Sequence, residues 1–500
     1  MTPRTTRVVL VAFLAAVGVA PVATHAAAIN CTQANLSAAI VAANSAGGGT
    51  ITFACSDTTI PMTNGLGSLL HDITLDGEDR RITLEYTPVA GCTKSNGGPA
   101  IAVLQGSANV IRNLTFKNFL ESIQVNGAGN TIEANTFLGH PTCSDDAISL
   151  PNNSSAVGNV FRANTFQDYV DKAIQMSYGG GTIEGNTFID TAQPIRGPYD
   201  NSQGEPFLIR NNVFRTSGDR SKCNGLQIDG AYIVEITGNT VECLRGIRLG
   251  GTTQATIRNN SISGNGRHGI LLFGDAVASL SGNTITGNGT SPGTQPPGGV
   301  VLWEDAVGSQ PQADLGGGSL TIDGVAVTST GGNTLTGNGP RDVRNLRTDA
   351  YVLRAEGNCW DGTTLGAIAG DVEGNVDFDP FATTCGAPPG MAPLILPLDP
   401  GDGDPCVLRT ALVSLLLQDF EEAIDPVSIG VIMNGQAVVP QVAGSGGTLT
   451  VSFPLPVSLP VDGAVVVQVS VADTAVPANT SMLTYGFTLE PPEATGVIAY

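Results

Sequence analysis

Acidic and basic side chains follow one another in a suggestive order near the middle of the sequence. Asp145 and Asp146 stand together, Asp171 and Lys172 stand together further on, and Arg196 follows. Paired carboxylates offer oxygen ligands for calcium. Lys and Arg can neutralise the charge of a bound anion, and a desolvated Lys can also take up a proton. These residues indicate a site that holds an acidic sugar, with calcium on Asp145, Asp146 and Asp171 and with Lys172 and Arg196 acting on the ligand.

Each of these residues also has a simpler interpretation. Asp145 and Asp146 can form a solvated turn, and Asp171 and Lys172 a local ion pair. The basic residues can form a surface ladder, and His268 fits a turn. Both interpretations stay open at the level of the sequence.

A repeated phrase predicts the scaffold that positions these residues. It has an apolar residue first, Asn fourth and an apolar residue sixth, and its copies begin 21 to 29 residues apart. The copies are 132–137, 161–166, 183–188, 209–214, 236–241, 257–262 and 280–285. A period of this length without a helical pattern predicts a parallel β-helix, in which the repeated Asn forms a structural ladder at a corner.

Stacked coils turn a sequence alignment into a list of spatial neighbours, because adjacent strands lie about 4.8 Å apart. Second strands are expected at 122–125, 147–150, 173–176, 194–196, 225–228, 246–249, 269–272 and 299–302. One place after their inward residue stand Ser149, Gln175, Arg196, Gln227, Arg248 and Leu271, and two places before it stand Asp146, Lys172, Gln193, Asn224, Arg245 and His268. We therefore expect Gln175, Gln193, Gln227, Arg245 and Arg248 to bind substrate beside Lys172 and Arg196.

A stretch of this region resembles a known family. Asp145-Asp146-Ala147, Asp171-Lys172-Ala173-Ile174-Gln175, Gly180-Gly181-Thr182-Ile183 and Ile195-Arg196 are similar in order and spacing to the compact calcium-dependent pectate lyases. The resemblance implies that Asp145 and Asp146 bind calcium, that Lys172 contacts substrate and that Arg196 completes the catalytic group. The chemistry of the side chains favours Lys172 as the base instead, since Arg is almost never deprotonated.

The sequence also departs from that family's pattern. Asp145 stands where the family has Glu, Gln193 where it has Lys, and Gly197-Pro198 where it has a Cys. Outside this window the chain resembles the broad class of right-handed β-helix repeat proteins.

The composition and the cysteines indicate where in or outside the cell the protein works. The 500-residue chain opens with a basic start and an apolar run that predict a signal peptide over 1–28, and its net charge is −21. We expect an exported protein, secreted or at the cell surface, with no membrane span and no nucleic-acid partner. The neighbouring cysteines suggest bridges 31–55, 92–143, 223–243 and 359–385, with Cys406 left over.

The chain divides into two predicted domains. A right-handed parallel β-helix is expected over 29–388, with a short helix at 36–43 covering its first coil. A linker rich in Pro and Gly is expected over 389–405. The phrases Asp425-Pro426, Asn434-Gly435 and Ala472-Asp473 resemble bacterial immunoglobulin-like modules, which implies a small β-sandwich over 406–500 that serves as a spacer or binding module.

Three functions compete for this all-β architecture. The first is calcium-dependent β-elimination of a polygalacturonate-like acidic polysaccharide. The second is a non-catalytic extracellular or cell-surface protein that binds a glycan. The third is a glycoside hydrolase that uses two carboxylates such as Asp146 and Asp171. The sequence does not define the oligomeric state.

Overall fold

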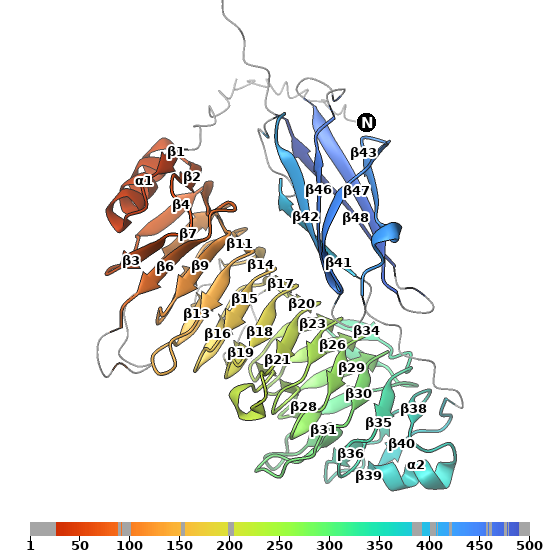
Figure 1. Ribbon diagram of the computed structural model, residues 1–500. Coiled ribbons are helices and arrows are strands. Elements are labelled where there is room, and N and C mark those ends of the chain that lie inside the picture. The colour runs from red at the N-terminus through yellow and green to blue at the C-terminus, as the bar shows by residue number, and fades with distance from the viewer. Residues whose placement is uncertain are drawn as a thin grey trace, which may run out of the picture.

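The chain forms a long stack of coils followed by a smaller unit of antiparallel sheets (Figure 1). The computed structural model describes residues 27–88, 92, 102–151, 156–198, 205–382, 393–400, 407, 409–419, 423–456, 459, 463–474, 478 and 480–489. Each coil of the stack contributes one strand to each of three sheets, here named sheets 1, 2 and 3. In one coil these are β14 (Asn159–Arg162), β15 (Thr165–Gln167) and β16 (Lys172–Met176). The neighbouring strands in these sheets are parallel, as a β-helix requires.

Sheets 1, 2 and 3 contain fourteen, twelve and twelve of the described strands. Sheet 1 contains β1 (Ala27–Ile29), β2 (Gly49–Phe53), β5 (Ile73–Asp76), β8 (Val110–Arg112), β11 (Thr131–Glu133), β14, β17 (Gly181–Glu184), β20 (Phe207–Arg210), β23 (Ile233–Thr237), β26 (Gln254–Arg258), β29 (Val277–Ser281), β32 (Gln312–Asp314), β37 (Leu353–Arg354) and β40 (Val376–Asp377). Sheet 2 contains β4 (Ser68–His71), β7 (Ala102–Ser107), β10 (Ile123–Val125), β13 (Asp146–Leu150), β16, β19 (Gln193–Gly197), β22 (Leu226–Ile228), β25 (Ile247–Leu249), β28 (His268–Phe273), β31 (Gly298–Trp303), β36 (Val343–Leu346) and β39 (Val372–Glu373). Sheet 3 contains β3 (Thr59–Met62), β6 (Ile82–Tyr86), β9 (Leu114–Lys117), β12 (Thr136–Leu138), β15, β18 (Thr187–Ile189), β21 (Val213–Arg215), β24 (Thr240–Val241), β27 (Ser261–Ser263), β30 (Thr284–Thr286), β35 (Thr334–Thr336) and β38 (Cys359–Trp360).

The repeated Asn lies at the corner between sheets 1 and 3 and holds adjacent coils together. The backbone N–H of Asn164 donates to Asn186 Oδ1 at 2.9 Å, and its own Nδ2 donates to the carbonyl of Ile132 at 2.8 Å. The same pattern continues through buried side chains at Asn135, Asn164, Asn186, Asn212, Asn239, Asn260, Asn283, Asn333 and Asn358. The predicted ladder is confirmed, because burial obliges these amides and the corner N–H groups to pair.

Inside the stack, aromatic rings from successive coils pack face to face. Phe137, Phe166, Phe188 and Phe214 follow one another with centroids 4.8–4.9 Å apart and planes within 8° of parallel. This spacing matches the separation of parallel strands, so the interior reproduces the backbone repeat.

Helices lie at the two ends of the stack (Figure 1). α1 (Gln33–Ala46) includes the predicted helix at 36–43 and extends it at both ends, between an N-cap on Thr32 and a left-handed Gly47. It buries Leu36 and Ile40 against the first coil. α2 (Leu365–Asp371) buries Ile368 at the other end. Both helices cover sheet edges that would otherwise be open to pairing.

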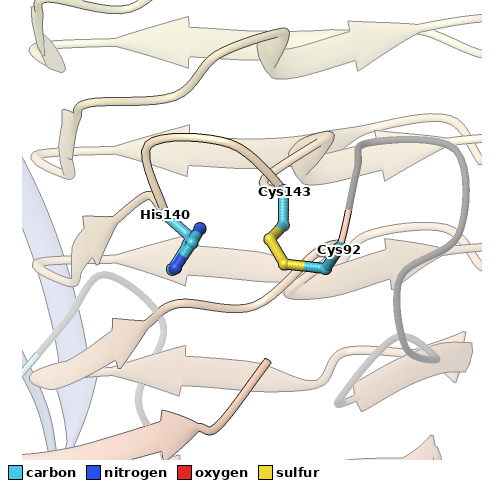
Figure 2. Close-up of side chains that lie close together, drawn as sticks. All are labelled: Cys92, His140 and Cys143. Carbon is cyan, nitrogen blue, oxygen red and sulfur yellow. A yellow bond between two sulfur atoms is a disulfide. The ribbon is translucent and has the colours of Figure 1, made fainter. Parts of the chain in front are cut away.

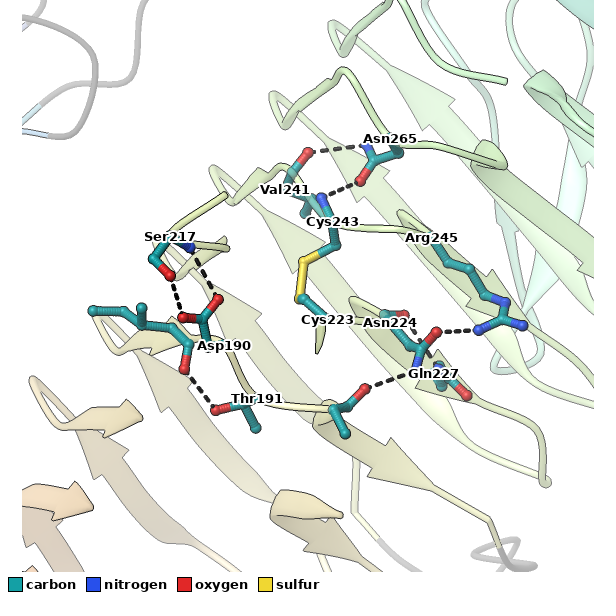
Figure 3. The surroundings of a disulfide bond; sticks show 12 residues. Asp190, Thr191, Ser217, Cys223, Asn224, Gln227, Val241, Cys243, Arg245 and Asn265 are labelled. Carbon is teal, nitrogen blue, oxygen red and sulfur yellow. Dashed lines mark hydrogen bonds between the residues drawn. A yellow bond between two sulfur atoms is a disulfide. The ribbon is translucent and has the colours of Figure 1, made fainter. Parts of the chain in front are cut away.

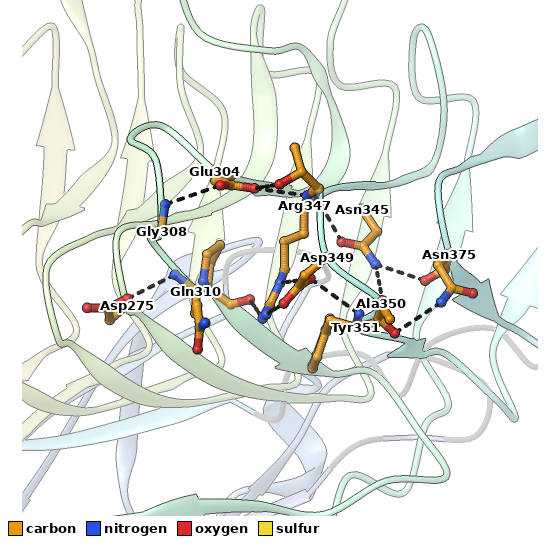
Figure 4. A network of polar contacts seen from close by, with 12 residues as sticks. Asp275, Glu304, Gly308, Gln310, Asn345, Arg347, Asp349, Ala350, Tyr351 and Asn375 are labelled. Atoms are coloured by element: carbon orange, nitrogen blue, oxygen red, sulfur yellow. Dashed lines mark hydrogen bonds and ion pairs between the residues drawn. The ribbon is translucent and has the colours of Figure 1, made fainter.

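Two insertions in the later coils are tied together by a polar network (Figure 4). Glu304 accepts hydrogen bonds from the N–H and hydroxyl of Thr348, and Arg347 donates to Asp349 and stacks over the ring of Tyr351 at 4.2 Å. A separate hairpin of β33 (Leu320–Ile322) and β34 (Val325–Val327) contacts β26 and β29 of sheet 1. Because these charged groups satisfy one another, we assign the network to structure.

Three of the predicted disulfides are confirmed. They join Cys31 to Cys55, Cys92 to Cys143 and Cys223 to Cys243. Cys359 is also in a disulfide, while its predicted partner Cys385 lies outside the described residues, as does Cys406.

The C-terminal unit consists of two antiparallel sheets. One contains β41 (Leu394–Asp399), β42 (Leu412–Gln418), β46 (Thr448–Pro454) and β45 (Gln441–Ser445), and the other contains β44 (Gln436–Val438), β43 (Gly430–Met433), β47 (Ala464–Ala472) and β48 (Thr480–Thr488). A short 3-10 helix covers Pro426–Ser428, and another in the β-helix covers Arg220–Lys222. Buried side chains of both sheets form one hydrophobic cluster, separate from the core of the β-helix.

The structure moves one predicted boundary. β41 lies inside the stretch 389–405 that was predicted as a linker, and it pairs with β42 along its length. The C-terminal unit therefore includes residues before 406, because the mostly apolar stretch Leu394–Asp399 pairs with β42 as an edge strand of its sheet. Within the described residues, no helix is long and apolar enough to cross a membrane.

Candidate functional site

Sheet 2 carries two polar files formed by residues that stand side by side on successive strands. The register pairs Ser149 with Gln175, then Arg196, Gln227 and Arg248, and ends at the buried Leu271; this is the outer file. It also pairs Asp146 with Lys172 and then Gln193, which form the leading file. The predicted alignment of second strands is thereby confirmed for these positions.

Lys172 lies at the centre of a group of carboxylates. Its Nζ lies 3.0 Å from Asp145 Oδ1, 2.9 Å from Asp146 Oδ1 and 3.0 Å from Asp171 Oδ2. Gln193 Nε2 donates to the other oxygen of Asp171 at 2.7 Å. The fold thus brings together the three predicted metal ligands, one predicted catalytic residue and one predicted substrate-binding residue, which we call the carboxylate cluster.

The protonation states in this cluster follow from burial and from the neighbouring charges. Burial raises the pKa of Asp146 to about 7 and also raises the pKa of Asp145, although Lys172 opposes both shifts. Burial by itself lowers the pKa of Lys172, but the carboxylates of Asp146, Asp145 and Asp171 outweigh it, so the pKa is raised above its ordinary value. Held in this way, Lys172 is a cation and not a proton acceptor.

Glu121 adds a fourth carboxylate that our sequence analysis missed. It accepts a hydrogen bond from Ser149 Oγ of the outer file, and burial raises its pKa. Ile123 pairs with Ile148, so Glu121 stands one coil before Asp146 at the equivalent position. Extending the alignment by one coil would have found it.

The oxygen donors suit a hard cation such as calcium by their chemistry. Three carboxylates already surround a positive charge, namely the ammonium of Lys172. Within the described chain, Cys92, His140 and Cys143 are the one group of three ligand-type side chains whose donor atoms all lie within 4.8 Å of one another, so the aspartate oxygens are spread more widely. A calcium ion on Asp145, Asp146 and Asp171 would have to displace Lys172.

The group of Cys92, His140 and Cys143 is a different case (Figure 2). Its two sulfur atoms are joined in a disulfide, so neither is a thiolate that could bind a metal. His140 Nδ1 accepts a hydrogen bond from the N–H of Thr142 at 3.3 Å. We therefore assign this group to the structure of the 140–143 turn.

Guanidinium groups replace carboxylates in the coils that follow. Arg196 donates to Asp229, and Arg248 Nη2 lies 3.2 Å from the same carboxylate oxygen. Arg248 also donates to Gln227 Oε1 at 3.4 Å. Asp229 was missed from the sequence, although it stands two places after Gln227 on the same outward side of the strand.

Arg245 and Arg267 extend this basic region, as Figure 3 shows for Arg245. Arg245 donates to Asn224 Oδ1 and, through Nε, to Gln295 Oε1 at 3.0 Å. The disulfide between Cys223 and Cys243 joins the two turns that carry Asn224 and Arg245. We call Arg196, Arg245, Arg248 and Arg267 the guanidinium cluster.

His268 lies beneath this cluster and not in a turn. It begins β28, is fully buried, and burial together with Arg245, Arg248 and Arg267 lowers its pKa to about 3. The prediction of a turn was wrong, because the strand begins two residues before its inward Ile270 and therefore includes His268.

Two aromatic rings lie beside the guanidinium cluster and were also missed. Arg248 stacks over the ring of Phe273 at 4.8 Å, and Phe273 lies 6.4 Å from Trp303. Both rings are partly exposed and stand two places beyond the outer file. By contrast Trp360, which has only 3% of its surface exposed, packs in the core and is not part of this surface.

The remaining predicted residues are placed as follows. Gln175 lies in the outer file next to Arg196 and donates to Ser177 Oγ at 3.2 Å. Lys172 and Arg196 lie on neighbouring strands three register positions apart, so their Cα atoms are about 11 Å from each other. They bind different carboxylates, and the structure does not bring their charged ends into contact.

Sheet 1 carries charged residues that stabilise the stack by pairing between neighbouring coils. Residues side by side on its successive strands alternate in sign, in the order Asp76, Arg112, Glu133, Arg162, Glu184 and Arg210. Adjacent members pair directly, with Arg112 Nε 2.8 Å from Asp76 and Arg162 Nε 2.6 Å from Glu133. On sheet 2 the charges are instead separated into a carboxylate cluster and a guanidinium cluster, which leaves fields of opposite sign along one face.

Solved structures that are similar to this chain at low identity include phage tailspike proteins. The chain is similar to the tailspike protein of the E. coli bacteriophage HK620, with a TM-score of 0.38 and 11% identity over 92% of this chain and 89% of that one. A second HK620 tailspike mutant, in complex with a pentasaccharide, gives 0.40 and 11% over 92% and 90%. The tailspike gp49 of the Acinetobacter baumannii bacteriophage Fri1, a capsular polysaccharide depolymerase, gives 0.31 and 10% over 92% and 78%. No curated protein matches the chain.

The sequence itself matches the family described as the right handed beta helix region over residues 71–241 and 224–338, which together span more than half of the chain. The three parallel sheets and the Asn ladder of the structure agree with that match. The chain therefore belongs to the right-handed β-helix family.

Proposed function

We propose that this protein binds an acidic polysaccharide along the outer face of sheet 2. The observation that carries the proposal is the separation of charge on that face, since Arg196 and Arg248 share the single carboxylate of Asp229. Two guanidiniums on one carboxylate keep a net positive charge, and planar guanidinium groups match the oxygens of a carboxylate. Gln175 and Gln227 supply neutral hydrogen-bonding groups in the same file.

We further propose that the protein cleaves the bound chain by calcium-dependent β-elimination. Asp145, Asp146 and Asp171 would hold the calcium ion, which when bound would neutralise a uronate carboxylate and acidify the hydrogen next to it. Arg196 is paired with Asp229 and stays protonated, so its part is to stabilise negative charge on the substrate. Lys172 would take up that hydrogen as a proton only after it has left the three carboxylates, which keep it protonated, and has lost its own proton to solvent. The C–O bond to the leaving sugar would then break, with its oxygen protonated by water.

A test of this proposal uses polygalacturonate with calcium, and then with a chelator. The expected result is a rising ultraviolet signal from an unsaturated product that the chelator removes. Arg196→Gln should lower the rate at least tenfold, whereas Arg258→Gln, which removes an exposed charge from sheet 1, should leave it unchanged. Equal rates in the two variants would contradict the role of Arg196.

Hydrolysis is a second candidate, and the carboxylates themselves favour it. A pKa of about 7 leaves Asp146 partly protonated near neutral pH, as a general acid requires, and Glu121 lies close enough for its charge to help raise that pKa. Inverting hydrolysis needs such a pair of carboxyl groups. Release of reducing ends without a double bond, abolished in Asp146→Asn, would favour this mechanism over elimination.

The C-terminal sheets fit an immunoglobulin-like spacer or binding module, and we propose that role for them. We also propose that the chain is exported and acts outside the cell or at its surface. If the protein binds the polymer and yields neither product, the function reduces to non-catalytic glycan binding.

A further inference from the structure

We infer that Arg245 and Arg267 form a second oxyanion site, which takes a sulfate ester or a carboxylate carried by the polysaccharide. The inference rests on the proposed function and extends it, because the site lies beyond the pair of Arg196 and Arg248. It adds Arg267, His268 and Gln295 to the residues that face the ligand.

The first argument is the lack of a counter-ion. Among the described residues, no ion pair places a carboxylate within 4.0 Å of Arg245 or Arg267, whereas Asp229 serves both Arg196 and Arg248. The partners of Arg245 are the neutral amide oxygens of Asn224 and Gln295. Arg267 Nε is buried with no hydrogen-bond partner in the described part of the chain.

The second argument is the repulsion among the cations themselves. Burial, together with the charges of Arg267 and Arg248, lowers the pKa of Arg245 to about 10. Arg245 nevertheless remains protonated at neutral pH. The two guanidiniums of Arg245 and Arg267 have no carboxylate partner among the described residues and favour binding of an anion, because an oxyanion would pair with their N–H groups and cancel the repulsion.

The third argument is the buried imidazole of His268. None of its surface is exposed, and neither ring nitrogen has a hydrogen-bond partner among the residues described. A buried polar group without a partner is unfavourable, so a ligand that pairs with it gains affinity. The ring stays neutral near pH 7, so it offers one N–H donor to an oxyanion without adding positive charge.

A loop completes the site from above. Residues 287–297 connect β30 to β31, and Gln295 in this loop accepts from Arg245 Nε. Gly293 packs against Arg267 so closely that a Cβ atom there would lie 2.7 Å from Nε. A side chain at this position would require the guanidinium of Arg267 to shift, so the loop and Arg267 are in direct contact.

The first experiment uses inorganic sulfate as the probe and the ring nitrogens of His268 as the reporter. The sequence has four histidines, so the imidazole signals in a nitrogen-15 NMR spectrum are few. In the full-length protein, sulfate should shift one imidazole signal in a saturable manner. Arg245→Gln combined with Arg267→Gln should weaken this binding at least tenfold, and Arg258→Gln should not change it.

Two outcomes would overturn the inference. One is the absence of a saturable shift in the wild-type protein. The other is equal affinity in the double variant and in Arg258→Gln. Arg267→Lys, which keeps the charge on the strand, provides a second variant if the double variant does not fold, and it should weaken sulfate binding because Lys lacks the planar fork.

A second experiment separates this inference from the proposed function and identifies the oxyanion. Binding of a sulfated glycan and of a polyuronate is measured for the wild type, for Arg196→Gln with Arg248→Gln, and for Arg245→Gln with Arg267→Gln. A larger loss for the sulfated polymer in the last variant would support a sulfate ester, and a larger loss for the polyuronate would support a carboxylate. Loss only in the Arg196 and Arg248 variant would overturn the inference and leave the proposed function standing. Failure of both polymers to bind the wild type would overturn the proposed function, while the sulfate titration would still decide the oxyanion site.

Discussion

At the scale of single residues, Lys172 is the group on which the acidic half of the surface depends. Its ammonium lies within 3.0 Å of three carboxylates, two of which are almost wholly buried. Replacing it with methionine leaves these charges without a cation, and we expect a loss of about 3 kcal/mol in the free energy of unfolding at pH 8. Urea unfolding measures this loss. Lys117→Met provides the control, because its pair with Glu85 is half exposed and should be worth less than about 1 kcal/mol.

The same variant tests the calcium proposal without an assay of activity. If Asp145, Asp146 and Asp171 can hold calcium, the ammonium of Lys172 competes with it. Calcium should therefore raise the melting temperature of Lys172→Met more than that of the wild type, since a ligand that binds the folded state more tightly stabilises it more. No effect of calcium on either protein, measured against a chelator control, would argue against these residues as ligands.

The raised pKa of Asp146 predicts how stability depends on pH. Between its unfolded value near 4 and its folded value of about 7, the folded protein keeps a proton that the unfolded chain has lost. Unfolding then releases a proton, so the stability that this group contributes at low pH is lost as pH rises through this window. Across this pH window, the free energy of unfolding of Asp146→Asn should fall less than that of the wild type, by at least about 1.4 kcal/mol, which is the equivalent of one pKa unit.

Asp342 contributes to the same decline of stability with rising pH, because burial raises its pKa to about 7 as well. Asp146→Asn will therefore remove only part of the decline. Asp219→Asn serves as the control. A hydrogen bond from Ser221 lowers the pKa of this exposed group, so its removal should not flatten the decline. An unchanged pH profile in Asp146→Asn would show that the carboxylate is not held protonated.

At the scale of the elements, the Asn ladder makes each coil depend on the next. Asn186 accepts from the backbone and side chain of Asn164 and donates to Phe161 and Asn212. Asn186→Ala leaves a buried N–H and a buried carbonyl without partners, and we expect a loss of about 2–3 kcal/mol in stability. Asn35→Ala, at an exposed position in α1, should cost far less. Similar losses for both variants in chemical unfolding would contradict the role of the ladder.

At the scale of the whole molecule, the two hydrophobic cores are separate. The cluster of the β-helix and the cluster of the C-terminal sheets share no described residue. Each unit therefore carries its own source of stability, and we expect two transitions when the protein is unfolded. Calorimetry of the full chain checks this, and Val469→Asp, which buries a charge in the C-terminal core, should shift one transition only. A single transition that shifts as a whole would show that the units fold together.

Much of the architecture follows from the sequence, because a stacked repeat makes equivalent residues into neighbours. The Asn ladder and the order of residues in the outer file needed only the alignment of coils, and the three disulfides needed only the pairing of neighbouring cysteines. The same alignment, carried one coil earlier, contains Glu121, and carried two places further it contains Asp229, Phe273 and Trp303. These residues were missed because the alignment was stopped too soon, and not because the signal was absent.

The sequence by itself determined which residues stand side by side, since strand register depends on the local pattern of apolar side chains. Only the tertiary structure decided which partners they choose and how they are charged. Lys172 binds three aspartates instead of facing solvent, Asp229 joins two arginines from different coils, and His268 is neutral beneath the guanidinium cluster. The physical reason is that charge interactions depend on distance in space and on the degree of burial, and both are set by how the coils pack on one another.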